Sequence, residues 1–107
     1  MATRCSIIVE GVDLVKVYKH WDGYPSNMVA WLSEFNQDFK ENRGVDAPYK
    51  FAQLLRSSIR DNGKYALDDS PYTGWGVFPM DTDMGVEFEY TLHTDGKVTF
   101  EPKEYKQ

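Results

Sequence analysis

The chain begins with two short stretches rich in β-branched residues, 3–11 and 13–20. Such stretches are typical of strands, and Gly11 lies at the reversal between them. The consecutive apolar run at 7–9 favours a strand that is buried on both faces. The N-terminal segment therefore predicts a pair of strands joined at Gly11.

The hydrophobic period changes to that of a helix over residues 26–44. The apolar residues of this segment recur at the spacing of one helix face: Met28, Leu32, Phe35 and Phe39, widened by Trp31. Ser26 or Asn27 can cap the start of this helix, and Gly44 can end it. We expect one amphipathic helix here.

A second helix is predicted after Gly44, with Asp46 as its cap and Pro48 in its first turn. Its apolar stripe consists of Phe51, Leu54, Leu55 and Ile59. The short connection at Gly44 favours an antiparallel pair of helices. Residues 64–76 are rich in Asp, Pro, Ser, Thr and Gly, which predicts a loop.

Three further strands are expected towards the C-terminus. Residues 74–80 form one candidate, and Pro79 favours an edge position for it. The next segment alternates strictly, with apolar Val86, Phe88, Tyr90 and Leu92 between polar Glu87, Glu89, Thr91 and His93. Such alternation is typical of a strand with one buried and one solvated face.

The last two strands are expected to form a hairpin with a three-residue turn, 94–96. This turn pairs Leu92 with Val98 and Tyr90 with Phe100, so that the apolar faces of the two strands coincide. It needs a left-handed residue where Gly96 stands. A two-residue turn would place the apolar faces on opposite sides of the sheet.

The predicted order of elements is β-β-α-α-β-β-β. Strands at both ends with helices between them favour an α+β fold, an antiparallel sheet of four to five strands with two helices packed on one face. A length of 107 residues suits a single domain covering 1–107.

The net charge of the chain bears on the kind of molecule that it can bind. The formal net charge is −5, from 17 acidic and 12 basic residues. Because neutralising phosphates requires clustered Lys and Arg, this balance argues against direct binding to nucleic acid. An acidic surface can instead compete for the basic groove of a protein that itself binds nucleic acid. We expect a protein partner, and a chain that is a monomer or a simple homodimer.

Cys5 is the only cysteine, which excludes an intrachain disulfide and a four-cysteine zinc site. The N-terminal apolar run is broken by Glu10 and Gly11, and no stretch approaches the length of a membrane span. These features predict a cytoplasmic protein of a reducing compartment, without membrane association and without a cofactor.

The stretch HWDGYP, residues 20–25, joins the second strand to the first helix and admits three interpretations. As a reactive site, His20 and Asp22 would be metal ligands, or a base and its orienting group. A metal site needs three or four converging ligands, however, and the only other histidine, His93, falls on a different strand. As a turn, Asp22 would hydrogen-bond nearby amides and Gly23 would take a positive φ.

The third interpretation is a binding surface that combines rigid aromatic area with polar tips, the chemistry enriched at interface hot spots. The residues of this predicted surface are His20, Trp21, Asp22, Tyr24, Tyr72 and Trp75. Core packing is expected for Phe78 rather than for Trp75. No catalytic and no metal-binding residue is expected.

The same corner carries a resemblance to a known group of proteins. Tyr18, His20, Asp22, Gly23, Tyr24 and Pro25 match the pattern Y-x-H-x-D-G-Y-P. This pattern resembles a signature of small, mostly uncharacterised proteins encoded by phages, prophages and other mobile elements. The glycine-containing segment associated with that signature is absent, since the chain continues as SNMVAWL. The resemblance implies a small accessory protein and no particular reaction.

Together, the resemblance and the acidity predict a non-catalytic protein-binding module of a phage or mobile element. In its most concrete form, this module is an anti-CRISPR-like inhibitor that occupies a basic nucleic-acid groove or a subunit interface of a host defence complex. The alternative is a small metal-dependent hydrolase or nuclease that uses His20 and Asp22.

Overall fold

The computed structural model describes residues 3–62 and 74–103, with the side chains of 58–62 excepted. The loop expected at 64–76 falls largely outside the described residues. Tyr72 and the side chain of Ile59 fall outside them as well.

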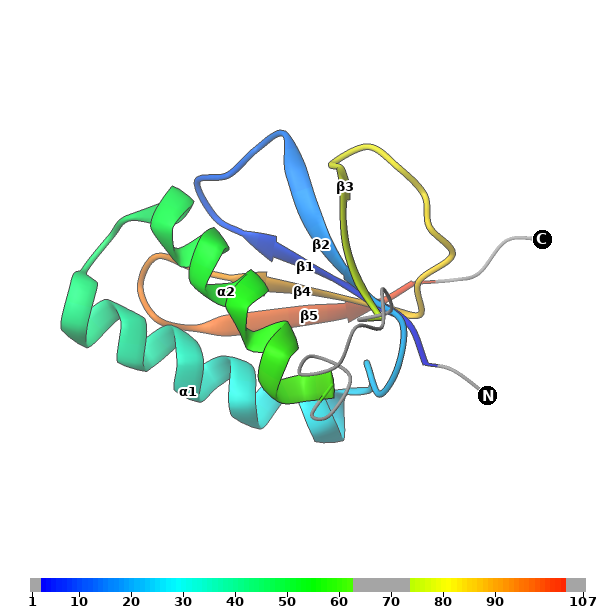
Figure 1. The fold of residues 1–107 in the computed structure, drawn as a ribbon, viewed down its shortest axis with the longest axis horizontal. Helices are drawn as coiled ribbons and strands as arrows, with labels where there is room; N and C mark the ends of the chain where they lie inside the picture. The colour runs from blue at the N-terminus through cyan, green and yellow to red at the C-terminus, as the bar shows by residue number, and fades with distance from the viewer. Residues whose placement is uncertain (1–2, 63–73, 104–107) are drawn as a thin grey trace.

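The elements follow the predicted order and form an α+β fold. They are β1 (Cys5–Val9), β2 (Val15–Lys19), α1 (Pro25–Arg43), α2 (Ala47–Asn62), β3 (Trp75–Pro79), β4 (Phe88–Leu92) and β5 (Val98–Pro102). Both helices lie on the same side of the sheet, as expected (Figure 1).

The five strands form one sheet in the order β3-β2-β1-β4-β5, and this sheet is mixed rather than antiparallel. β1 and β4 are parallel, whereas the other three pairs are antiparallel. The expectation of an antiparallel sheet was wrong because alternation along a strand carries no information about its direction. The connection between β3 and β4 returns the chain to the end of the sheet where β1 begins, on the side away from the helices (Figure 1).

The β4–β5 hairpin has the predicted register. Leu92 pairs with Val98 and Tyr90 with Phe100. Gly96 has a φ of 94°, and its amide donates to the His93 carbonyl oxygen at 3.1 Å. The three-residue turn is thus confirmed, together with the left-handed glycine that it needs.

The main core lies between the sheet and the helices. Its fully buried members come from both layers: Cys5, Ile7, Val9, Val17, Met28, Leu32, Leu54, Tyr90 and Leu92. β1 is the central strand and is covered on both faces, because Ser6 on its other face is also buried. The apolar run at 7–9 predicted this placement.

The two helices begin differently. Asp46 caps α2 as expected, since its Oδ1 accepts a hydrogen bond from the Tyr49 amide at 3.3 Å. α1 starts at Pro25 with Tyr24 as its N-cap residue, without a side-chain cap. Neither Ser26 nor Asn27 caps it, because proline fixes φ at the first helical position and has no amide to be satisfied.

Neither described helix combines the length and the apolar composition that crossing a membrane demands.

Candidate functional site

Backbone contacts shape the corner between β2 and α1. Asp22 has a φ of 57°, and its carbonyl oxygen accepts a hydrogen bond from Asn27 Nδ2 at 2.7 Å. Gly23 is buried, and its amide donates to the Thr3 carbonyl oxygen at 2.9 Å. A Cβ on Gly23 would lie 2.8 Å from the Cβ of Cys5. The positive φ was therefore predicted at the wrong residue, since it belongs to Asp22, and Gly23 is needed for space.

Two side chains from the sheet hold the carbonyl groups of this corner. Tyr90 Oη donates to the Gly23 carbonyl oxygen at 2.6 Å, and Lys19 Nζ donates to that of Trp21. Burial raises the pKa of Tyr90, so its hydroxyl remains a donor throughout the neutral range. With its backbone fixed in this way, the corner presents the indole of Trp21 to solvent, 49% exposed.

Side chains of β2 alternate between the two faces of the sheet. Val17 and Lys19 are buried on the side of the helices, so Tyr18 and His20 lie on the opposite side, the outer face. Phe78 of β3 joins them there, because it stands opposite Lys16 in the β2–β3 register.

Four rings form a continuous series on and beside this outer face. The centroids of Phe78 and Tyr18 are 5.7 Å apart, those of Tyr18 and His20 are 6.0 Å apart, and those of His20 and Trp21 are 4.8 Å apart. We call Phe78, Tyr18, His20 and Trp21 the aromatic row. Two of the three contacts are edge-to-face, a geometry that aromatic pairs favour and that fixes the rings relative to one another.

A hydrogen bond at the centre of the aromatic row fixes the imidazole. Tyr18 Oη and His20 Nδ1 are 2.7 Å apart. Desolvation raises the pKa of Tyr18, so its hydroxyl is protonated at neutral pH and can donate to Nδ1. His20 Nε2 has no hydrogen-bond partner among the described residues.

The predicted surface residues at the corner point outward rather than into the core. Trp21 and Tyr24 are 49% and 41% exposed, and Asp22 is exposed between them. No described residue donates a hydrogen bond to the Asp22 carboxylate. The corner therefore offers exposed aromatic area beside an uncommitted negative charge.

The second predicted aromatic group is placed differently. Trp75 stands opposite Lys19 on the side of the helices, where its ring lies 6.2 Å from that of Trp31 and packs against the core. Phe78 is 36% exposed on the outer face. The assignment of Phe78 to the core and of Trp75 to the surface was thus reversed, because a shift of one position along a strand changes the face.

The hydrolase hypothesis depends on metal ligands that converge, and the sheet separates the two histidines. His20 follows β2 and His93 follows β4, and since these strands run in opposite directions, the two residues lie at opposite ends of the sheet. His93 Nε2 is 2.6 Å from Thr99 Oγ1. Within 3–62 and 74–103, no three residues of His, Cys, Asp or Glu are grouped for a metal ion.

Charged residues occupy the centre of the outer face, beside the aromatic row. Glu89 accepts a hydrogen bond from Ser6 Oγ at 2.7 Å and lies 3.3 Å from Lys16 Nζ and 3.4 Å from Lys103 Nζ. Burial alone would raise the pKa of Glu89, but the bonds from Ser6 and Lys16 and the two positive charges outweigh it and lower the pKa. Lys103 Nζ also lies 2.8 Å from a Glu101 carboxylate oxygen, so the two lysines and the two glutamates of this Glu89 cluster balance in charge.

The connection between β3 and β4 passes over the Glu89 cluster. It leaves a hollow of about 360 Å³ lined by Lys16, Met80, Asp81, Thr82, Asp83, Met84, Val86, Glu89 and Lys103. Asp81 and Asp83 are exposed at this hollow. They add two carboxylates to the outer face.

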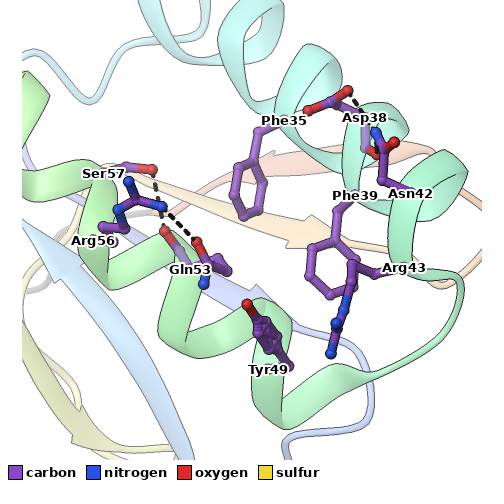
Figure 2. A pocket seen from close by; sticks show the side chains of 9 residues that line it. All are labelled: Phe35, Asp38, Phe39, Asn42, Arg43, Tyr49, Gln53, Arg56 and Ser57. Carbon is purple, nitrogen blue, oxygen red and sulfur yellow. Dashed lines mark hydrogen bonds between the residues drawn. The ribbon is translucent and has the colours of Figure 1, made fainter.

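A second hollow, of about 270 Å³, lies between the two helices and was not predicted. Figure 2 shows Phe35 and Phe39 from α1 and Tyr49 from α2 around it. The guanidinium of Arg43 lies 4.0 Å from the centroid of the Tyr49 ring and 3.7 Å from an Asp46 carboxylate oxygen. The second arginine of this hollow, Arg56, donates to Gln53 Oε1 at 3.3 Å. Because both arginines are already engaged by groups of the chain itself, this hollow is a weaker candidate than the aromatic row.

The sequence contained a signal for one of the two residues that the prediction missed. Tyr18 precedes His20 by two positions on a strand, so a shared face follows from strand periodicity alone. Phe78 has no such signal. Its place in the aromatic row depends on the pairing of β3 with β2 across more than fifty residues of chain.

No protein family, no curated protein and no solved structure matches the chain in the comparisons made with each.

Proposed function

We propose that the chain is a non-catalytic protein-binding module that binds a basic partner through the aromatic row and the adjoining Asp22 and Tyr24. The observation that carries this proposal is the continuous series of four rings on and beside the outer face, two of them substantially exposed. Binding energy at protein interfaces is concentrated in such aromatic groups.

Charge selects the class of partner. The exposed carboxylates of Asp22, Asp81 and Asp83 lie at the corner and on the outer face, and the chain has a net charge of −5. The faces of Trp21 and Phe78 attract guanidinium groups by cation–π interaction. Aromatic rings with carboxylates beside them suit an arginine-bearing surface, such as the groove of a nucleic-acid-binding protein.

The more specific form of the proposal is an anti-CRISPR-like inhibitor from a phage or mobile element. The match of residues 18–25 to Y-x-H-x-D-G-Y-P supports such an origin. In this form, the aromatic row competes with nucleic acid for the groove of a defence effector. The inhibitor would act at a fixed stoichiometry and would not turn over.

Affinity capture from bacterial lysates that contain defence complexes tests the proposal. Wild type is compared with Trp21→Ala and with a control, Val45→Ala. The control removes an apolar side chain at the turn between the helices that is more exposed than Trp21, 70% against 49%. We expect wild type and Val45→Ala to capture a nucleic-acid-binding protein that Trp21→Ala does not, and we expect added DNA or RNA to displace it. Equal capture by all three proteins, or a complex that nucleic acid leaves intact, would refute the proposal.

A further inference from the structure

The outer strand β5 presents backbone groups that the sheet leaves unpaired. The His93 amide donates to the Lys97 carbonyl oxygen at 2.9 Å, and the Lys103 amide donates to that of Glu87 at 2.8 Å. Odd-numbered residues of β5 therefore face β4, and the amides of Val98 and Phe100 point away from the sheet. No described residue accepts a hydrogen bond from either amide.

The side chains of β5 leave this edge accessible. Four of its five residues are exposed, including Phe100 at 44%. α1 packs against β4 and β5, but it leaves the Phe100 side chain partly exposed. Charged side chains and proline usually protect exposed edge strands. β5 ends in Pro102, but the charges of Lys97, just before the strand, and Glu101, within it, are of opposite sign and lie on either side of Thr99, so they can pair with those of a second copy.

We propose that β5 pairs antiparallel with β5 of a second copy of this chain, so that two five-stranded sheets become one continuous sheet. In a two-fold arrangement centred on Thr99, the amides of Val98 and Phe100 donate to the carbonyl groups of Phe100 and Val98 in the second copy. All four outward-pointing amides of the two strands are then satisfied. Pro102, which has no amide to donate, lies outside this pairing.

The charged residues in and beside β5 favour this register over the two registers whose centre is shifted by one residue. Centring on Thr99 places each Lys97 opposite Glu101 of the second copy, and Thr99 opposite itself, both favourable cross-strand pairs. Moving the centre one residue towards the C-terminus places Lys97 opposite Lys103. Moving it one residue towards the N-terminus places Asp95 opposite Glu101. Like charges directly opposite one another are destabilising.

On the side of the helices, the same register places the exposed Phe100 of each copy against the half-buried Val98 of the other. Val98 of each copy stands opposite Phe100 of the other, and Phe100 already contacts Phe88 and Tyr90 at centroid distances of 6.4 and 5.7 Å. The aromatic cluster of one sheet would therefore continue into the other. This dimer leaves the aromatic row free, because β3 and β5 lie at opposite edges of the sheet.

Sedimentation velocity from micromolar to millimolar protein concentration measures dimerisation. The inference is tested by comparing wild type with variants in which the charges at positions 97 and 101 are reversed. Glu101→Lys creates a lysine–lysine pair at each of the two symmetric places where Lys97 faces residue 101. We expect this to raise the dissociation constant of the dimer about ten-fold. Glu101 also pairs with Lys103 of its own chain at 2.8 Å, a contact that the single and the double variant both lose. The double variant Lys97→Glu with Glu101→Lys restores the opposite pairs across the dimer and should therefore dimerise more tightly than Glu101→Lys alone. Glu34→Lys, an exposed position on α1, is the control for the change in net charge.

A disulfide checks the register. Oxidised Thr99→Cys should give a covalent dimer, whereas Phe100→Cys should not. Cys5 is buried and does not compete. A chain that is monomeric at every concentration, a dimer that persists in Glu101→Lys, or efficient linkage through Phe100→Cys would each overturn the inference. A strand supplied by a different protein would also overturn it.

Discussion

Asp22 and Gly23 form the corner by different means, although both look like turn residues in the sequence. Asp22 accepts a left-handed backbone that asparagine and aspartate tolerate better than most residues. Gly23 has no positive φ but sits where a Cβ would be 2.8 Å from Cys5 Cβ and 2.9 Å from the Thr3 carbonyl oxygen. Its neighbours are a buried side chain and backbone, so neither moves aside easily.

Substitution of the two residues should therefore have opposite results. Gly23→Ala is expected to lower the free energy of unfolding by about 1–3 kcal/mol, the usual cost of overpacking. Asp22→Gly should be neutral or slightly stabilising, because glycine adopts the positive φ without strain. Urea denaturation of both variants measures this difference. A Gly23→Ala variant as stable as wild type would show that the corner has room for a methyl group.

Lys50 is a buried cation that forms no ion pair with another described residue. It is 2% exposed, and its Nζ donates to Asn36 Oδ1 at 2.7 Å. Desolvation lowers the pKa of Lys50 in the folded protein, an effect that the charge of Glu10 partly offsets. Between this lowered pKa and the ordinary value of 10.5, the unfolded chain binds more protons than the folded one. In that window, the contribution of Lys50 to stability rises with pH.

This linkage predicts how Lys50→Met compares with wild type. The difference in free energy of unfolding between them should shift in favour of wild type as the pH is raised from neutral towards 10.5. Using the difference removes the contribution of Tyr90, whose raised pKa makes the protein lose stability above the ordinary tyrosine range. Chemical denaturation at a series of pH values provides the measurement, and a difference that does not change with pH would contradict a lowered pKa.

Among the elements, the β4–β5 hairpin and α1 hold one another in place through polar contacts. Asn36 Nδ2 donates to the carbonyl oxygens of His93 and Lys97, each at 2.9 Å. Lys40 Nζ donates to that of Asp95 at 3.1 Å. The helix therefore satisfies carbonyl groups on both sides of the hairpin turn, and it fixes the start of β5 relative to the core.

Gly96 lies where the hairpin turn meets α1. Its φ is 94°, and an added Cβ would lie 2.8 Å from Gln37 Oε1. Gly96→Ala should destabilise by about 1 kcal/mol because of φ. Gln37 is exposed and Oε1 is the far end of a flexible side chain, so the side chain can move aside and the approach should add little. A double-mutant cycle with Gln37→Ala should therefore be nearly additive, and a strong coupling would show that Gln37 cannot move aside.

The order of elements and the hairpin register could be predicted because both follow from local periodicity. Met28, Leu32 and Phe39 mark the buried face of α1, and the alternation before Thr94 selects the turn length. The parallel pairing of β1 with β4 could not be predicted, since it results from a long connection without a sequence signature. The position of Phe78 on the outer face could not be predicted for the same reason, since it depends on the register between β2 and β3.

In the whole molecule, one face of the sheet packs against the helices and the other carries the aromatic row. The helices and the sheet enclose the apolar core on one side, so its burial does not require the aromatic row on the other. Lys16 and Lys103 offset Glu89 and Glu101 on the outer face, while the carboxylates of Asp81 and Asp83 stay exposed. A basic partner would therefore meet rings and negative charge together, and its affinity should fall as salt is raised.

The aromatic row and the adjoining corner either bind a partner or serve only to stabilise the fold. The affinity for the captured partner distinguishes these two roles. Calorimetric titration of the purified partner gives the Kd of wild type, Trp21→Ala and Val45→Ala, with circular dichroism and urea midpoints as the check on folding. We expect Trp21→Ala to keep the fold and raise the Kd about ten-fold or more, and Val45→Ala to bind as wild type does. A folded Trp21→Ala protein that binds as tightly as wild type would contradict this account of the molecule.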